Sequence, residues 1–302
     1  MKRALLVTNL TARSVSPRLK QVIQNALSAD LDLQIADTSH RNHATELSRQ
    51  AAEQGLDLVI AFGGDGTMNE VVNGLAGTDT ALAILPGGMA NVFCRSLGIP
   101  VDIVEATGYL LNRIKNYQTR SVNIGHIDGR YFVMSCGIGL DAATVRRTET
   151  NPSAKRQFRD WFFLWSAVRT AVTEYRGKAP YIHLSAGDLS EDVVLAVISN
   201  IGAFTFFKNW QVTITPQARI EEGLDVFSMR RFPITYIPGI LISAFKTGSH
   251  VRHKHASYAH DVASVSLKSS GDPFPVQVDG EFLGERTELA VDLVPDGLKL
   301  LD

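Results

Sequence analysis

The sequence of 302 residues predicts an α/β protein with two domains, and three observations support this fold class. Buried-strand and amphipathic-helix patterns alternate over residues 4–114, which is typical of a parallel sheet covered by helices. Short strand patterns separated by turn signals dominate the rest of the chain, as in a β-sandwich. The length is also too great for one average domain and suits two.

The first domain is predicted to be Rossmann-like and to span residues 1–124, completed by about 292–302. Strands are expected at 4–7, 31–35, 58–62 and 81–85, and helices at 19–27, 44–54, 68–75, 90–97 and 103–114. Ligands of such sheets bind beyond the carboxyl ends of the strands. Two glycine-rich turns, at 63–67 and 86–88, follow strands at this edge.

The second domain, residues 125–291, is predicted to be a mostly antiparallel β-sandwich. Its strands are expected at 121–127, 131–135, 181–185, 193–199, 212–215, 225–229, 263–268, 275–279 and 287–293. Helices are expected near 154–175 and 234–246.

Composition narrows the class of protein. The formal net charge is -1 and no run of basic residues occurs, so a nucleic-acid partner is not expected. Cys94 and Cys136 lie in apolar surroundings and are predicted to be free buried thiols in a reducing cytoplasm. Neither a signal peptide nor an apolar stretch of membrane-spanning length is visible, which favours a cytoplasmic protein. Nothing in the sequence indicates an oligomeric state.

The segment Gly63-Gly64-Asp65-Gly66-Thr67 follows a predicted strand and opens a predicted helix. Glycines permit a tight turn and a close approach of the backbone to phosphate, and the amides of a helix N-terminus attract anions. Asp65 would repel phosphate directly, so we expect it to act through magnesium or on an acceptor hydroxyl. The alternative is a tight turn in which Asp65 only caps a helix.

Two common nucleotide-binding patterns are missing. The sequence contains no Gly-x-x-x-x-Gly-Lys-Ser/Thr loop. It also lacks the Gly-x-Gly-x-x-Gly fingerprint with an acid about 20 residues later, which argues against a hydride-transfer enzyme.

Residues 63–75, Gly-Gly-Asp-Gly-Thr-Met-Asn-Glu-Val-Val-Asn-Gly-Leu, resemble the signature of the diacylglycerol kinase catalytic domain family. The similarity is closest to soluble bacterial lipid kinases, with sphingosine and ceramide kinases as more distant relatives. Residues 85–91, 136–142, 216–226 and 278–281 match further family segments in the same order. Five segments in order are much more specific than any single one.

The resemblance implies a nucleotide domain like those of NAD kinase and diacylglycerol kinase, with ATP bound between it and a lipid-binding second domain. The implied reaction is ATP- and Mg²⁺-dependent transfer of the γ-phosphate to a hydroxyl of diacylglycerol or a related lipid, with transient contact to a membrane surface. The implied nucleotide-binding residues are Asn9, Thr38, Gly63, Gly64, Asp65, Gly66, Thr67, Asn69, Glu70, Gly87, Gly88, Met89 and Asn91.

The implied catalytic residues are Asp65, Asp279 and Glu281. The spacing of the last two puts both side chains on one face if the segment is extended. One carboxylate would then orient or deprotonate the acceptor hydroxyl while the other helps to bind magnesium. The alternative is an ordinary Asp-Gly hairpin turn at the surface.

A structural magnesium site is also implied by the resemblance. Its ligands would be the carboxylate of Glu222, where relatives usually have aspartate, and backbone carbonyls at Arg219 and Leu224. The alternative is a solvated acidic turn.

Three departures from the family pattern leave other functions open. Met89 stands where threonine is usual, Val92 stands where aspartate is frequent, and residues 9–14 lack the usual Asn-Pro and following glycine. One alternative is phosphorylation of a soluble acceptor, as in NAD kinase. Another is a lipid or nucleotide sensor without catalysis.

Histidines 250, 253, 255 and 260 are expected to lie in a solvated loop, because their spacing fits no standard zinc pattern. Residues 155–165 mix basic and aromatic side chains. A helix there would place four aromatic residues on one face, namely Phe158, Trp161, Phe162 and Trp165. Such a face suits a membrane surface, although packing on the second domain is the alternative.

We predict that Trp161→Ala and Trp165→Ala weaken binding to phospholipid vesicles, because indole rings anchor proteins at the interface between water and lipid. Vesicle co-sedimentation of both variants beside the parent protein measures this. Unchanged binding would refute a membrane-facing helix.

Overall fold

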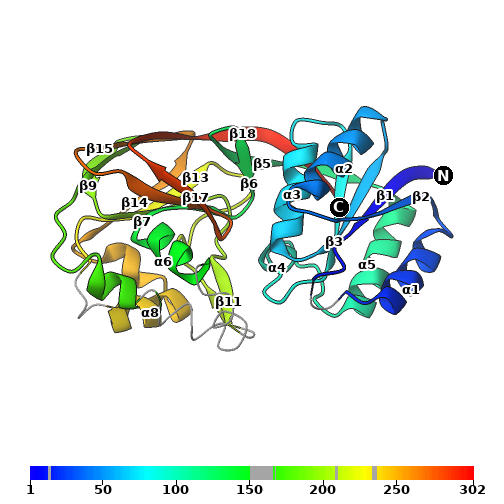
Figure 1. The fold of residues 1–302 in the computed structure, drawn as a ribbon, viewed down its shortest axis with the longest axis horizontal. Helices are drawn as coiled ribbons and strands as arrows, with labels where there is room; N and C mark the ends of the chain where they lie inside the picture. Colours follow the sequence, from blue (N-terminus) through cyan, green and yellow to red (C-terminus); the bar gives the residue numbers. More distant parts are fainter. Residues whose placement is uncertain (13–14, 150–165, 167, 208–209, 233–236) are drawn as a thin grey trace. The chain divides into compact units, whose positions relative to one another are not determined.

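The computed structural model describes residues 1–12, 15–149, 166, 168–207, 210–232 and 237–302. The chain forms two compact units (Figure 1). The first consists of Met1–Ile124 and Val294–Asp302, and the second of Gly125–Leu293.

The first unit alternates strands and helices, which confirms the predicted α/β class. Its elements are β1 (Lys2–Thr8), α1 (Pro17–Leu27), β2 (Leu31–Asp37), α2 (His43–Glu53), β3 (Leu58–Gly63), α3 (Asp65–Leu75), β4 (Ala81–Pro86), α4 (Val92–Ser96) and α5 (Ile103–Asn116). The strand order is β2-β1-β3-β4, all parallel, and the C-terminal end of β18 (Glu288–Leu301) pairs in parallel with β4.

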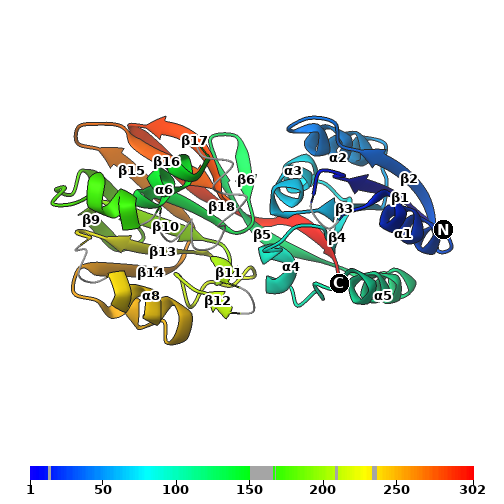
Figure 2. The same ribbon diagram turned by 60° about the horizontal axis from the view of Figure 1, so that its bottom comes forward.

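Local sequence signals explain several helix boundaries. Ser16 caps α1 by accepting the amide of Leu19 at 3.2 Å, and Pro17 occupies the first turn. Asp102 caps α5 by accepting two amides of its first turn. Every residue of β3 and β4 is buried, as expected for strands with helices on both faces (Figure 2).

The second unit is rich in strands. Its elements are β5 (Thr119–Ile127), β6 (Arg130–Phe132), β7 (Ser135–Gly139), α6 (Leu140–Glu149), β8 (Ile182–Ala186), β9 (Leu189–Val193), β10 (Leu195–Ser199), β11 (Thr205–Phe207), β12 (Trp210–Val212), β13 (Leu224–Met229), α8 (Ile237–Lys246), the 3-10 helix η2 (Ser249–Arg252), β14 (Ala256–Val262), β15 (Ser264–Ser269), β16 (Phe274–Val278) and β17 (Glu281–Arg286). The chain passes between the units within β5 and β18.

Two antiparallel layers confirm the predicted β-sandwich. One has the order β14-β13-β10-β7-β16-β17, and the other has the order β18-β15-β8-β9. Their facing side chains share one buried core, which includes Ile138, Ile198 and Val276 from the first layer and Leu184 and Val291 from the second.

The structure corrects the sequence-based view of the histidine segment. Residues 256–262 form strand β14, so His260 belongs to the sheet rather than to a solvated loop. His250 is buried, with Nδ1 3.1 Å from Ser243 Oγ and Nε2 2.8 Å from the Ile214 carbonyl. Burial lowers the pKa of His250, so this ring is a neutral core residue.

The aromatic segment 155–165 lies outside the described residues, so its predicted role stays a prediction. Among the helices that the structure describes, none combines the length and apolar character needed to cross a membrane.

Helices α2 and α3 pack closely because residue 74 has no side chain. Gly74 is buried, and a β-carbon there would lie 2.6 Å from the Thr45 carbonyl oxygen and 2.7 Å from Ser48 Cβ. The Thr45 hydroxyl donates to the Glu70 carbonyl at 2.8 Å across the same contact.

We predict that Gly74→Ala lowers the free energy of unfolding by about 1–3 kcal/mol, because overpacking outweighs the higher helix propensity of alanine. Gly108→Ala is a matched control, since Gly108 is an exposed residue of helix α5 and a β-carbon there would meet open space. That variant should instead gain about 0.5–1 kcal/mol. Urea unfolding of both variants and the parent protein measures these changes in the free energy of unfolding. Equal changes in the two variants would contradict the packing argument.

Candidate active site

Three strands of the first unit end side by side at the carboxyl edge of the sheet. The Thr38 amide, after β2, donates to the Thr8 carbonyl at 2.9 Å. The Asn9 amide, after β1, donates to the Phe62 carbonyl at 3.1 Å. The structure therefore brings Asn9 and Thr38 to the strand edge where β3 leads into the first glycine turn.

Asn9 also holds the first turn of α3. Its side-chain amide donates to Thr67 Oγ1 at 3.0 Å, and its Oδ1 accepts the backbone amide and the hydroxyl of Thr11. Asn9 is therefore oriented from one side by Thr11 and fixes the Thr67 hydroxyl on the other.

The two glycine turns touch through their backbones. The Gly87 amide donates to the Gly63 carbonyl at 2.7 Å. A β-carbon at Gly87 would lie 2.9 Å from Gly63 Cα, and one at Gly88 would lie 2.7 Å from Gly64 Cα. No L side chain fits between the turns, so backbone alone forms this surface.

The N-terminus of α3 has no side-chain cap, because its N-cap residue is Gly64. No N-cap side chain therefore accepts its first amides, which carry the positive end of the helix dipole. A β-carbon at Gly66 would meet open space. This combination of open space and uncapped amides fits a phosphate group.

Asp65, the first residue of α3, points its carboxylate toward the start of α4. Its Oδ1 accepts the Phe93 amide at 3.3 Å. Burial raises the pKa of Asp65, while the amides of Phe93, Val92 and Asn91 act in the opposite direction. Asp65 thus caps a neighbouring helix, which shows that the capping alternative describes part of its role.

The second glycine turn is closed by Asn91. Asn91 has a left-handed backbone with φ 44°, its Oδ1 accepts the Gly88 amide at 2.9 Å, and its Nδ2 donates to the Gly88 carbonyl. Met89 projects from this turn with 47% of its surface exposed. Val92 is buried in α4, so its side chain contributes to packing.

Two further residues of the signature, Asn69 and Glu70, have polar partners within the first unit. The Glu70 carboxylate accepts the Ala44 amide at 3.1 Å, which places it at the N-terminus of α2. Asn69 is buried and accepts from the Asn73 side chain at its carbonyl and at Oδ1. These contacts link Glu70 to α2 and Asn69 to Asn73, and the nucleotide-binding role of both residues stays a prediction.

In the second unit, Asp279 and Gly280 form the two-residue turn between β16 and β17. Both have positive φ, 47° and 83°, as a type I′ hairpin requires. The expectation that Asp279 and Glu281 lie on one face of an extended segment is therefore wrong, because Asp279 is not extended.

The two carboxylates contact different partners. Asp279 accepts the amides of Val133, Met134 and Ser135 at 2.9–3.2 Å, which ties the turn to the segment between β6 and β7. Glu281 forms a salt bridge with Arg130 of β6. Arg130 was not singled out from the sequence, since its partner is 151 residues away.

Two hydrogen bonds connect the turn 279–280 to the buried side chains of Gln277 and Asp141. The Gly280 amide donates to Gln277 Oε1, and Gln277 Nε2 donates to Asp141 Oδ2, each at 2.8 Å. A β-carbon at Gly137 would lie 1.7 Å from that Asp141 oxygen, so only glycine leaves room for the hydrogen bond between Gln277 and Asp141. The segment 136–142 contains Asp141 and Gly137, but its sequence alone does not reveal their partner.

The predicted structural-magnesium segment, with Arg219, Glu222 and Leu224, stays a prediction. The Glu222 carboxylate faces His260 Nε2 at 3.7 Å, and His260 Nδ1 lies 2.7 Å from buried Asp225. The hydrogen bond to Asp225 raises the pKa of His260. The Arg219 carbonyl accepts the Glu222 amide in a tight turn, and Leu224 lies buried in β13.

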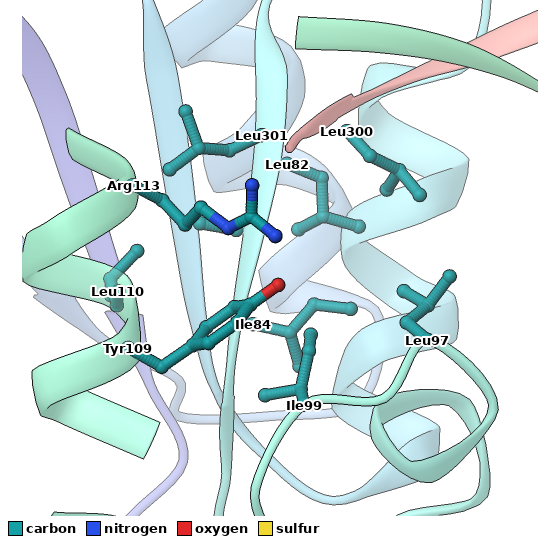
Figure 3. Close-up of a pocket in the computed structure, with 10 residues that line it drawn as sticks. Leu82, Ile84, Leu97, Ile99, Tyr109, Leu110, Arg113, Leu300 and Leu301 are labelled. Carbon is teal, nitrogen blue, oxygen red and sulfur yellow. The ribbon is translucent and has the colours of Figure 1, made fainter. Parts of the chain in front are cut away.

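A small cavity of about 20 Å³ in the first unit is not a ligand site (Figure 3). Leu82, Ile84, Leu110 and Leu300 line it, with Arg113 over the Tyr109 ring at 5.0 Å. Its volume is that of about one water, which is too small for a nucleotide or a lipid.

Sequence comparison decides the family. The pattern of the diacylglycerol kinase catalytic domain matches residues 3–127. The pattern of the YegS C-terminal NAD kinase beta sandwich-like domain matches residues 133–302. The chain belongs to the diacylglycerol kinase family. A member of this family is a lipid kinase, which confirms the prediction of a kinase over a hydride-transfer enzyme.

Individual relatives agree over nearly the whole chain. The diacylglycerol kinase of Bacillus subtilis (strain 168) is 29% identical over 297 residues, covering 94% of this chain and 91% of the relative. The diacylglycerol kinase of Staphylococcus carnosus (strain TM300) is 25% identical over 291 residues, covering 94% and 90%.

Solved structures support the same fold for this family member. A diacylglycerol kinase from Bacillus anthracis str. Sterne superimposes with a TM-score of 0.73 at 21% identity, covering 99% of this chain and 96% of the other. Yeast NADH kinase complexed with NADH has a TM-score of 0.51 at 8% identity, covering 99% and 83%. At these identities the likeness concerns the fold alone.

The buried carboxyl of Asp141 gives a prediction for pH dependence. Burial raises the pKa of Asp141 to about 6, partly offset by the Gln277 amide. The native state then holds this proton more tightly than the unfolded chain, so the contribution of Asp141 to stability falls as pH rises from about 4 to above 6.

Asp141→Asn keeps an acceptor for Gln277 and carries no charge at any pH. Relative to the parent, it should gain on the order of 2–3 kcal/mol at pH 8 and little at pH 4. Urea unfolding of both proteins at the two pH values measures the difference. A pH-independent difference would show that the carboxyl does not titrate in this range.

Proposed function

We propose that this lipid kinase transfers the γ-phosphate of ATP to a lipid hydroxyl in a Mg²⁺-dependent reaction, with diacylglycerol as the favoured acceptor. The observation that carries the proposal is the backbone surface of the two glycine turns beside the uncapped N-terminus of α3. The names of the Bacillus subtilis and Staphylococcus carnosus relatives support the acceptor.

The phosphates of ATP would contact the amides of residues 63–67 and the turn 87–91. The amides and the helix dipole supply positive potential at this site. Gly66 leaves open space where a side chain would otherwise stand. Asn9 would orient the Thr67 hydroxyl toward the nucleotide, since its amide holds that oxygen at 3.0 Å.

Asp65 is the carboxylate that we propose as a ligand of Mg²⁺. Mg²⁺, when bound, neutralises charge on the transferred phosphate, and carboxylate oxygens are its usual protein ligands. The bond from the Phe93 amide restricts the Asp65 side chain to one orientation. A preorganised carboxylate loses little conformational entropy when a cation binds.

We propose that residues 279–281 contact the lipid acceptor. Both Asp279 oxygens accept backbone amides, so this side chain is suited to shape the turn rather than to take a proton. Glu281 is therefore the carboxylate proposed to orient the acceptor hydroxyl, with Arg130 balancing its charge. A lipid acceptor implies contact with a membrane surface, for which residues 155–165 remain the proposed segment.

Two other functions stay as outcomes of the test. Yeast NADH kinase has a similar fold, and a soluble acceptor is therefore the first alternative that the test includes. Exposed Met89, in place of a threonine hydroxyl, motivates a sensor that binds nucleotide without turnover.

The test is transfer from [γ-³²P]ATP, with Mg²⁺, to diacylglycerol vesicles, a mixed lipid extract and NAD. Label in diacylglycerol is expected. Label only in NAD would favour the soluble-acceptor alternative, and ATP binding with no labelled product would favour the sensor.

Asp65→Asn is expected to lower the rate at least about 100-fold, as loss of one charge-stabilising group does. Asparagine can still accept the Phe93 amide, so the fold should persist and melting temperature checks it. Asp79→Asn is the matched control, because Asp79 is an exposed acid paired with Lys299. Near-normal transfer in Asp65→Asn would refute the role proposed for Asp65.

A further inference from the structure

The connection from β2 to α2 and the first turn of α2 carry a cluster of possible metal ligands, His40, His43 and Glu46, hereafter the His40 cluster. One potential ligand atom from each residue lies within 4.8 Å of those of the other two. The residues are spaced by three, and His43 and Glu46 neighbour each other on one face of α2. The two imidazole rings stack with centroids 4.5 Å apart.

The surroundings of His40 leave its Nε2 ready to bind a metal. Its Nδ1 lies 2.9 Å from the Arg41 carbonyl oxygen. A carbonyl only accepts, so Nδ1 carries the proton and Nε2 carries the lone pair in the neutral ring. Metal-binding histidines commonly donate their other ring N–H to a backbone carbonyl in this way.

The contacts of His43 with Ser39 favour the opposite tautomer in the free protein. Its Nδ1 lies 3.1 Å from both the Ser39 amide and the Ser39 hydroxyl. The amide only donates, so in the free protein it favours a lone pair on Nδ1. A metal on Nε2 selects the other tautomer, in which Nδ1–H donates to the Ser39 hydroxyl and the hydrogen bond from the Ser39 amide is lost. The proton moves between ring nitrogens through solvent, and no net charge is created.

We propose that the His40 cluster binds one divalent transition-metal ion of the zinc type. The two imidazole nitrogens and the Glu46 carboxylate would be ligands, and water would complete the coordination shell. Two nitrogen donors and one oxygen donor suit Zn²⁺, Co²⁺ or Ni²⁺, whereas Mg²⁺ and Ca²⁺ prefer oxygen alone.

A bound ion would cross-link two neighbouring segments at the start of α2, and the Glu46 carboxylate would offset the repulsion between the cation and the positive helix end. Asn42, the N-cap residue of α2, has φ 66° and makes no side-chain capping bond. The ion would join the loop after Thr38 to the first turn of α2. Since it binds the native state, it should raise the melting temperature as its concentration rises. This proposal does not depend on the kinase reaction.

The test is calorimetric titration of chelator-treated full-length protein with ZnCl₂. One high-affinity equivalent is expected, with a blue to violet absorption when CoCl₂ replaces zinc. His40→Ala and His43→Ala should each remove this equivalent, and Glu46→Gln should weaken it. Ser39→Ala should weaken binding about 10-fold or more, as loss of an outer-shell partner does.

The matched control is the double variant His253→Ala and His255→Ala, whose rings lie 5.6 Å apart elsewhere in the chain. It should keep full zinc binding. Circular dichroism verifies that each variant is folded, which exposed positions 40 and 46 should tolerate. Absence of a zinc equivalent in the parent, or its persistence in His40→Ala and His43→Ala, would overturn the proposal.

Discussion

The Gly87 amide meets the Gly63 carbonyl at 2.7 Å, and this backbone contact is the constraint on which the candidate nucleotide site depends. Gly63, Gly87 and Gly88 all lie where a β-carbon would collide with the opposing turn or with the first turn of α3. Two strand ends can approach this closely only without side chains. The contact fixes the N-termini of α3 and α4 relative to each other, so Asp65 of one helix can accept an amide of the other.

A similar use of glycine appears in the second unit. Gly137 leaves room for the Asp141 carboxylate and the Gln277 amide, and Gln277 in turn holds the Gly280 amide. A buried carboxylate costs free energy unless it is hydrogen-bonded, and the raised pKa of Asp141 reflects that cost. The turn 279–281 is thus held from two sides, by this chain and by the three amides that donate to Asp279.

Acidic residues near helix starts divide their roles between folding and chemistry. Glu70 caps α2, and Asp65 caps α4 while remaining beside the uncapped start of α3. The same positive helix ends attract a carboxylate from the protein or a phosphate from a ligand. The N-cap of α3 is glycine, so no N-cap side chain occupies the position that an anion would take.

The sequence by itself determined the α/β first unit, the β-sandwich and the kinase family, because these depend on local periodicity and on ordered motifs along the chain. It also located the glycine turns and the Asp-Gly turn, since their residue types reflect local backbone conformation. Only the tertiary structure decided which partners those residues meet. Arg130 with Glu281, His260 with Asp225 and Asp141 with Gln277 pair across 35 to 151 residues. Such pairs depend on strand register and packing, which no local pattern encodes.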